Sequence, residues 1–220
     1  MPVVHALWAG ESGGEFVAPD LTEVAARAAA ATVHVGAKVT DDLGRPGQVS
    51  GSGTLLSEDG YIVTNNHVVA GAEKVNVTLS NGKELDASVV GADATTDVAV
   101  LKVDARNLPF LPYANSNEVK IGEWVLAAGY PFSLGATVTA GIVSAKARLS
   151  AMTYIQTDAA INHGNSGGPL VNREGELIGI IVTFASGTDA YVGYSFAIPA
   201  NTVKKVVNEI MQPGHRQAKS

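Results

Sequence analysis

The sequence predicts an all-β fold of two six-stranded antiparallel barrels, with a short helix near each end. Short segments rich in Val, Ile and Leu recur at close spacing and are separated by turn signals, which is typical of small antiparallel barrels. These segments form two sets of six, one on each side of an irregular connection over residues 104–117 that carries two prolines. No apolar run approaches the roughly 20 residues of a membrane span, so no membrane-spanning helix is expected.

Composition narrows the classes of protein that this chain can belong to. The chain has 220 residues, of which 46% are apolar and 16% charged, so it can bury a core and is not generally disordered. A net charge of −6 without a basic cluster argues against binding nucleic acid. The absence of cysteine excludes thiol catalysis, disulfides and thiolate metal sites, but leaves the compartment open. Residues 1–10 have no basic leader and do not read as an intact signal peptide.

The first half of the chain contains an arm, a helix and six strands. Residues 1–19 show no sustained period and predict an extended N-terminal arm. Asp20 and Glu23 form a variant of the capping box, and an apolar stripe after them predicts a helix to about residue 30. Asn81-Gly82 between alternating apolar residues is a strong hairpin signal. The helix and first barrel together make the unit 20–110, with strands expected at 32–39, 53–57, 61–64, 74–79, 84–93 and 98–103.

The second half repeats this number of strands without a residue-level repeat. A closing helix is expected at 203–211, because Val203, Val206, Val207 and Ile210 share one helical face and Pro213 follows it. The second barrel and this helix make the unit 111–211, and residues 212–220 form a tail. The strands are expected at 124–129, 137–146, 154–157, 169–172, 177–184 and 194–198.

One serine lies in an unusual run of glycines. Residues 162–170 read N-H-G-N-S-G-G-P-L. Because glycine tolerates positive φ and close backbone approach, Gly164, Gly167 and Gly168 suit a strained loop that presents the hydroxyl of Ser166. Acyl transfer needs such a hydroxyl together with backbone N–H groups that stabilise an oxyanion. Clusters of Gly and Ser are nevertheless more often plain turns, so the assignment depends on the rest of the chain.

A nucleophilic serine needs a base, and His67 is the best placed of the five histidines. It follows the predicted strand 61–64 at a strand–turn junction, where a side chain can face a cleft. His163 is too close to Ser166 in sequence to accept its proton on a tight loop. His34 alternates with valines and is expected on a strand face.

The base needs a carboxylate that fixes its tautomer. Asp97 begins a buried-looking strand, where a carboxylate requires a partner because burying an unpaired charge is costly. Asp93 and Asp158 remain alternatives, and a plain turn is the other interpretation of Asp97. The chain order His67, Asp97, Ser166 is that of chymotrypsin. It would place two members in the first barrel, one in the second, and the site between the barrels.

Three segments resemble the signature blocks of the HtrA (DegP/DegQ-type) serine proteases. They are residues 64–69 (T-N-N-H-V-V), 96–102 (T-D-V-A-V-L-K) and 156–170, and the similarity extends from about 31 to 210. The resemblance implies a chymotrypsin-like double barrel that hydrolyses peptide bonds of unfolded or misfolded proteins without a cofactor or metal. It also implies a homotrimer and a location in the periplasm or cell envelope, with an organelle as the other possibility.

The resemblance also implies a role for each residue of the site. Ser166 would be the nucleophile, His67 the general base and then acid, and Asp97 the residue that orients the histidine. The N–H groups of Gly164 and Ser166 would line an oxyanion hole, with Asn165 between them setting the loop.

The primary specificity pocket is expected to be apolar. Trypsin-like relatives place an acidic residue six positions before the serine, and this position is Ala160 here. We therefore expect cleavage after small or medium aliphatic residues, with the substrate bound as an added strand near residues 182–184. The implied substrate-binding residues are Ile161, Val182, Thr183 and Phe184.

The chain also departs from the family pattern. Family members continue into one or two PDZ modules, and this chain ends about where the first begins, so we expect a protease domain without PDZ. A catalytically resting or idle protein that acts as a chaperone-like binding module is the alternative, although the complete triad favours a protease. An α/β-hydrolase is disfavoured, because its serine lies in G-x-S-x-G and comes first in the chain.

Overall fold

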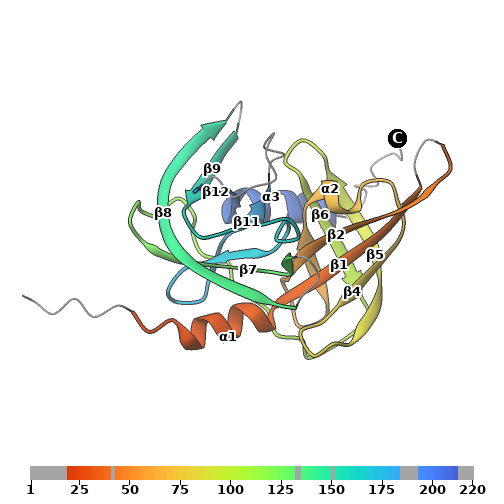
Figure 1. Ribbon diagram of the computed structural model, residues 1–220, viewed down its shortest axis with the longest axis horizontal. Helices are drawn as coiled ribbons and strands as arrows, with labels where there is room; N and C mark the ends of the chain where they lie inside the picture. The colour runs from red at the N-terminus through yellow and green to blue at the C-terminus, as the bar shows by residue number, and fades with distance from the viewer. Residues whose placement is uncertain (1–18, 41–42, 132–134, 150–151, 184–192, 213–220) are drawn as a thin grey trace, which may run out of the picture.

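The computed structural model contains two closed β-barrels that lie side by side (Figure 1). It describes residues 19–40, 43–131, 135–149, 152–183 and 193–212. The predicted arm and tail therefore lie almost wholly outside the described residues. The all-β prediction with two six-stranded antiparallel barrels is confirmed.

The first barrel has the strand order β1-β2-β3-β6-β5-β4, with every neighbouring pair antiparallel. The prediction of β2 was wrong at its start, because the strand begins at Pro46 instead of residue 53. Residues 46–50 pair with β1 although they are mostly exposed and include only one large apolar side chain, Val49, so no apolar period marks them. The strands are β1 Thr32–Thr40, β2 Pro46–Leu55, β3 Tyr61–Thr64, β4 Ala72–Thr78, β5 Glu84–Asp93 and β6 Val98–Val103.

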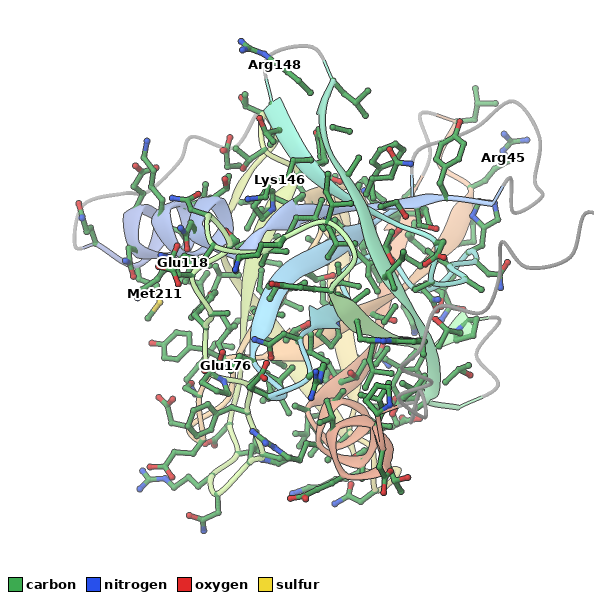
Figure 2. The ribbon with its side chains drawn as sticks, turned by 90° about the vertical axis from the view of Figure 1, so that its left-hand side faces the viewer. Arg45, Glu118, Lys146, Arg148, Glu176 and Met211 are labelled. Carbon is green, nitrogen blue, oxygen red and sulfur yellow. The ribbon has the colours of Figure 1, made fainter. Side chains whose placement is uncertain are left out.

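The second barrel has the order β10-β11-β12-β9-β8-β7. Its longest strand, β8, continues to residue 149 instead of the predicted 146, because it stays paired with β9 as far as Leu149 and Met152. Figure 2 shows Arg148 near the outer end of this hairpin, with Lys146 closer to the body of the molecule. The strands are β7 Trp124–Gly129, β8 Thr137–Leu149, β9 Met152–Thr157, β10 Pro169–Val171, β11 Leu177–Val182 and β12 Ser195–Pro199.

The helices of the described residues are α1 Thr22–Ala30, α2 Asn66–Val69 and α3 Ala200–Met211. The carboxylate of Asp20 accepts a hydrogen bond from the backbone N–H of Thr22 at 2.9 Å, but the N-cap residue of α1 is Leu21 instead of the predicted Asp20. The closing helix begins at Ala200, earlier than the predicted residue 203. The single turn α2 was not predicted, since four residues are too few to show a helical period.

The two barrels share a hydrophobic core. Val182 and Ile198 of the second barrel belong to the same buried cluster as the interior of the first, while a second cluster fills the second barrel. The terminal helices join the barrels further. Helix α1 precedes the first barrel but packs against β7 and β8, and α3 follows the second barrel but contacts β5 and β6 (Figure 1). No helix among the described residues is long and apolar enough to cross a membrane.

Candidate active site

His67 and Asp97 lie together on the first barrel. His67 is carried by α2, directly after β3, and Asp97 stands just before β6. One carboxylate oxygen of Asp97 lies 2.7 Å from Nδ1 of His67, and the other accepts the backbone N–H of His67 at 2.9 Å. Because the carboxylate accepts the Nδ1 proton, the neutral ring keeps its lone pair on Nε2. His67 is therefore in the tautomer that a general base needs.

A buried amide holds the backbone of Asp97. Asp97 has a φ of 57°, in the left-handed region that few residues other than glycine adopt. The side chain of Asn65 donates from Nδ2 to the carbonyl oxygen of Asp97 at 2.9 Å, and Asn65 has no exposed surface. The Oδ1 atom of Asn65 is buried without a hydrogen-bond partner among the described residues. Asn65 thus supports the turn from which the Asp97 carboxylate reaches His67.

Ser166 lies on a tight loop between β9 and β10, and we call residues 162–168 the serine loop. Gly164 and Gly167 in this loop have φ values of 98° and 89°. A Cβ atom on Gly167 would lie 2.1 Å from the carbonyl oxygen of Ser52. The positive φ and this close approach restrict position 167 to glycine, as the sequence pattern predicts.

The serine loop presents two backbone donors beside Ser166. The carbonyl oxygens of Gly164 and Ser166 accept hydrogen bonds from the hydroxyl and the backbone N–H of Ser52, at 2.6 and 2.8 Å. Within the described part of the chain, the N–H groups of Gly164 and Ser166 have no hydrogen-bond partner. Unpaired N–H groups next to a nucleophile are what an oxyanion hole consists of.

The hydroxyl of Ser166 faces Thr183, which follows the last residue of β11. The two hydroxyls are hydrogen-bonded, and the backbone N–H of Thr183 lies 3.3 Å from Oγ of Ser166. Among the described residues Ser166 makes no hydrogen bond to His67. Catalytic hydrogen bonds are often long or poorly aligned without substrate, so this geometry does not remove Ser166 and His67 from a common site.

The predicted substrate-binding residues occupy different environments. Thr183 contacts Ser166, as described above, but the side chains of Ile161 and Val182 are only 6% and 5% exposed. Ile161 packs in the core of the second barrel and Val182 in the shared core. Phe184 lies outside the described residues. The role of these four residues in substrate binding stays a prediction.

Burial lowers the pKa of one histidine outside the His67–Asp97 pair. His34 lies on β1, as expected, where its Nε2 is 2.8 Å from the hydroxyl of Ser50 and its ring meets that of Tyr130 edge-on. Partial burial lowers the pKa of His34, and the negative charge of Glu84 opposes this shift. His34 therefore favours its neutral form in the folded chain.

Sequence reasoning missed Ser52 and Asn65. Both form contacts across long sequence separations, and only Ser52 stands in a local pattern that hints at one. Ser52 stands between Gly51 and Gly53 within a strand, a pattern that often marks a close approach of another backbone.

Comparison with known proteins identifies similar peptidases. A family model described as a trypsin-like peptidase domain matches residues 51–180. A probable periplasmic serine endoprotease, DegP-like, of Chlamydia muridarum is 48% identical over 171 residues, covering 76% of this chain and 34% of that protein. A protein of the same description from Hahella chejuensis is 50% identical over 171 residues, covering 76% of this chain and 36% of its own. This chain thus spans about a third of the length of these relatives.

Solved structures of the same family have this fold. The HtrA-type protease AlgW with a tripeptide superimposes with a TM-score of 0.82 at 40% identity, covering 88% of this chain and 64% of that one. The same protease with a decapeptide gives a TM-score of 0.80 at 38% identity, covering 89% and 69%. The family model matches more than half of the chain, and the chain covers 69% of the HtrA-type protease AlgW at 38% identity, so with its chymotrypsin-like double barrel the chain belongs to the trypsin-like peptidases of the HtrA type.

Proposed function

We propose that this chain is a serine endopeptidase that cleaves unfolded or misfolded proteins through a His67–Asp97–Ser166 triad and an acyl-enzyme. The observation that carries the proposal is the carboxylate of Asp97, which binds both the ring and the backbone of His67. This arrangement leaves the lone pair of the neutral ring on Nε2, where a general base needs it. The glycine loop that carries Ser166 adds the second requirement of acyl transfer, which is a set of unpaired backbone donors.

The proposed reaction has two halves. Oγ of Ser166 attacks the scissile carbonyl carbon while Nε2 of His67 takes the hydroxyl proton, and the N–H groups of Gly164 and Ser166 bind the resulting oxyanion. His67 then gives the proton to the departing amine, which leaves an acyl-enzyme. In the second half His67 deprotonates a water that attacks the ester, and the free acid departs with Ser166 restored. Asp97 stabilises the imidazolium in both halves, and Asn165 sets the backbone between the two donors.

The substrate is expected to be an extended chain. A peptide that adds as a strand beside residues 182–184 must have no structure of its own, so unfolded segments fit this edge. Ala160 offers no charge for a basic side chain, and Ile161, Val182, Thr183 and Phe184 would give an apolar pocket for small or medium aliphatic residues. A periplasmic or cell-envelope location is supported by the names of the relatives, which are described as periplasmic. The homotrimer is an expectation from the family, which light scattering of the purified chain tests.

Degradation of a casein-like unfolded substrate tests the function directly. The wild-type chain is expected to cleave it and Ser166→Ala to leave it intact at unchanged thermal stability. Mass spectrometry of the products then checks the aliphatic preference. Cleavage that persists in Ser166→Ala would refute the assignment of the nucleophile.

The alternative is a resting or idle form with a chaperone-like binding role. In that case neither the wild-type chain nor Ser166→Ala would cleave casein, although both are folded. Labelling of Ser166 by a fluorophosphonate probe would then identify a resting protease, and no labelling would identify an idle binding module.

A further inference from the structure

Ser52 connects the first barrel to the serine loop of the second. It lies on β2 with no exposed surface. Its hydroxyl donates to the carbonyl oxygen of Gly164 at 2.6 Å, and its backbone N–H donates to the carbonyl oxygen of Ser166 at 2.8 Å. One residue of the first barrel therefore binds the carbonyls of both residues whose N–H groups form the proposed oxyanion hole.

A second hydrogen bond fixes the direction of the Ser52 hydroxyl. The backbone N–H of Tyr130, which directly follows β7, donates to Oγ of Ser52 at 2.9 Å. A hydroxyl carries a single proton, and with Oγ accepting from Tyr130 that proton is directed to Gly164. The resulting chain of hydrogen bonds runs from the second barrel through Ser52 and back to the serine loop.

Gly164 is the residue that most needs such a partner. Glycine has the widest choice of backbone conformations, because it has no Cβ atom to restrict them. Nothing in the residue itself therefore holds Gly164 at its φ of 98°. A hydrogen bond to its carbonyl oxygen fixes the peptide plane between Gly164 and Asn165, which holds the Cα atom of Gly164 and restrains the preceding peptide, whose N–H is the proposed donor. Since oxyanion donors are effective only when they are oriented before the charge develops, this restraint bears on the reaction rate.

We propose that Ser52 is a positioning residue that keeps the oxyanion hole formed before substrate binds. It acts through Gly164 and touches neither the substrate nor the reacting atoms. This role rests on the proposed peptidase function and adds to it a contribution of the first barrel to transition-state stabilisation.

Thr54 provides a matched control on the same strand and face. It is fully buried, and its hydroxyl donates to the carbonyl oxygen of Gly167 at 3.1 Å. Thr54 thus binds the serine loop at Gly167, after the two residues whose N–H groups are the proposed oxyanion donors. Thr54→Val removes a buried hydroxyl bond to the same loop without altering the hydrogen bond at Gly164.

The test compares Ser52→Ala with Thr54→Val in the full chain, using kcat and KM for a peptide identified among the casein products. Both variants are expected to melt at lower temperature. Only Ser52→Ala should lower kcat, by about 10- to 100-fold, since removing an oxyanion donor outright costs 10²- to 10³-fold. Its KM should stay within about twofold, because an oxyanion donor acts on the transition state.

A peptide aldehyde gives an independent measurement, because its adduct with Ser166 carries the oxyanion. Its inhibition constant should rise in Ser52→Ala by the same factor by which kcat falls. Ser52→Cys, whose thiol is a weaker donor, should give an intermediate kcat.

Equal losses of kcat in Ser52→Ala and Thr54→Val would overturn the role of Ser52, and so would a loss confined to KM. A failure of the proposed function is distinguishable from this result. In that case the wild-type chain itself cleaves no substrate and its Ser166 does not react with a fluorophosphonate.

Discussion

Replacing Asn65 with leucine tests how Asp97 is held in place. Leucine is close to asparagine in shape but cannot donate a hydrogen bond. The change therefore removes the 2.9 Å bond from Nδ2 of Asn65 to the carbonyl oxygen of Asp97 and leaves the carboxylate itself untouched. It also removes the Oδ1 atom, which is buried without a partner among the described residues.

These two losses have opposite effects on stability. The substitution leaves the partly buried carbonyl oxygen of Asp97 without its donor, which costs up to about 1–3 kcal/mol, and removal of the unpaired Oδ1 atom returns a similar amount. We therefore expect the free energy of unfolding to change by no more than about 1 kcal/mol, which corresponds to a shift in Tm of about 2–4 °C for a chain of this size.

Activity should respond far more strongly than stability. Without the amide, the left-handed turn at Asp97 can relax and carry the carboxylate away from His67. Small displacements of catalytic groups cost about 10²-fold in rate, and loss of the correct histidine tautomer costs about 10⁴-fold, which sets the upper limit. We expect kcat of Asn65→Leu to fall by roughly 10²-fold.

Cleavage kinetics and thermal melts of the same preparations check this prediction. A normal kcat would mean that Asp97 keeps its conformation without Asn65. A fall in Tm well beyond the expected few degrees would mean that Oδ1 of Asn65 is not the unpaired atom that the reasoning requires.

Three further changes have expected outcomes. Asp97→Asn should lower kcat/KM by about 10⁴-fold at unchanged Tm, because His67 would adopt the wrong tautomer, and near-normal turnover would remove Asp97 from the triad. Gly129→Ala should lower both Tm and kcat, because the new Cβ would lie 2.6 Å from Oδ1 and 2.9 Å from Cα of Asn165. An unchanged melting curve would contradict that crowding. His34→Phe should flatten the dependence of stability on pH in urea titrations. The pKa of His34 is lower in the folded chain than its ordinary value of 6.5. As pH falls below 6.5, the unfolded chain therefore binds a proton at this residue before the folded chain does, and wild type loses stability. Parallel curves for the two proteins would exclude His34 as the cause.

Most of the fold could be predicted because each barrel strand is bounded by turns and has an apolar face. The errors fall where this signal is absent. Residues 46–50 are strand only because β1 offers them hydrogen bonds, and no property of their own side chains shows it. The turn α2 is too short for periodicity, yet it sets the position of His67.

The site was predictable where its chemistry needs particular residue types. A base, a carboxylate and a serine among glycines can be found in the sequence, and the structure brings His67 and Asp97 together. The contacts of Ser52 and Asn65 could not be predicted, because their partners lie 112 and 32 positions away. Thr183 was predicted to line a pocket, but that pattern gave no indication that its hydroxyl would bind Ser166.

Each terminal helix packs against strands of the barrel that lies farther from it in sequence, and this affects what happens when the chain is cut. A break in the connection over residues 104–117 would leave α1 on one fragment and β7 and β8, which it covers, on the other. The second fragment would likewise carry α3 away from β5 and β6, where Gly91 has room for Ile210 only because it lacks a side chain. Neither fragment could then bury its own apolar surface. Such a cut would therefore yield two pieces that fold by complementing each other, and a nicked molecule would stay associated instead of releasing a half.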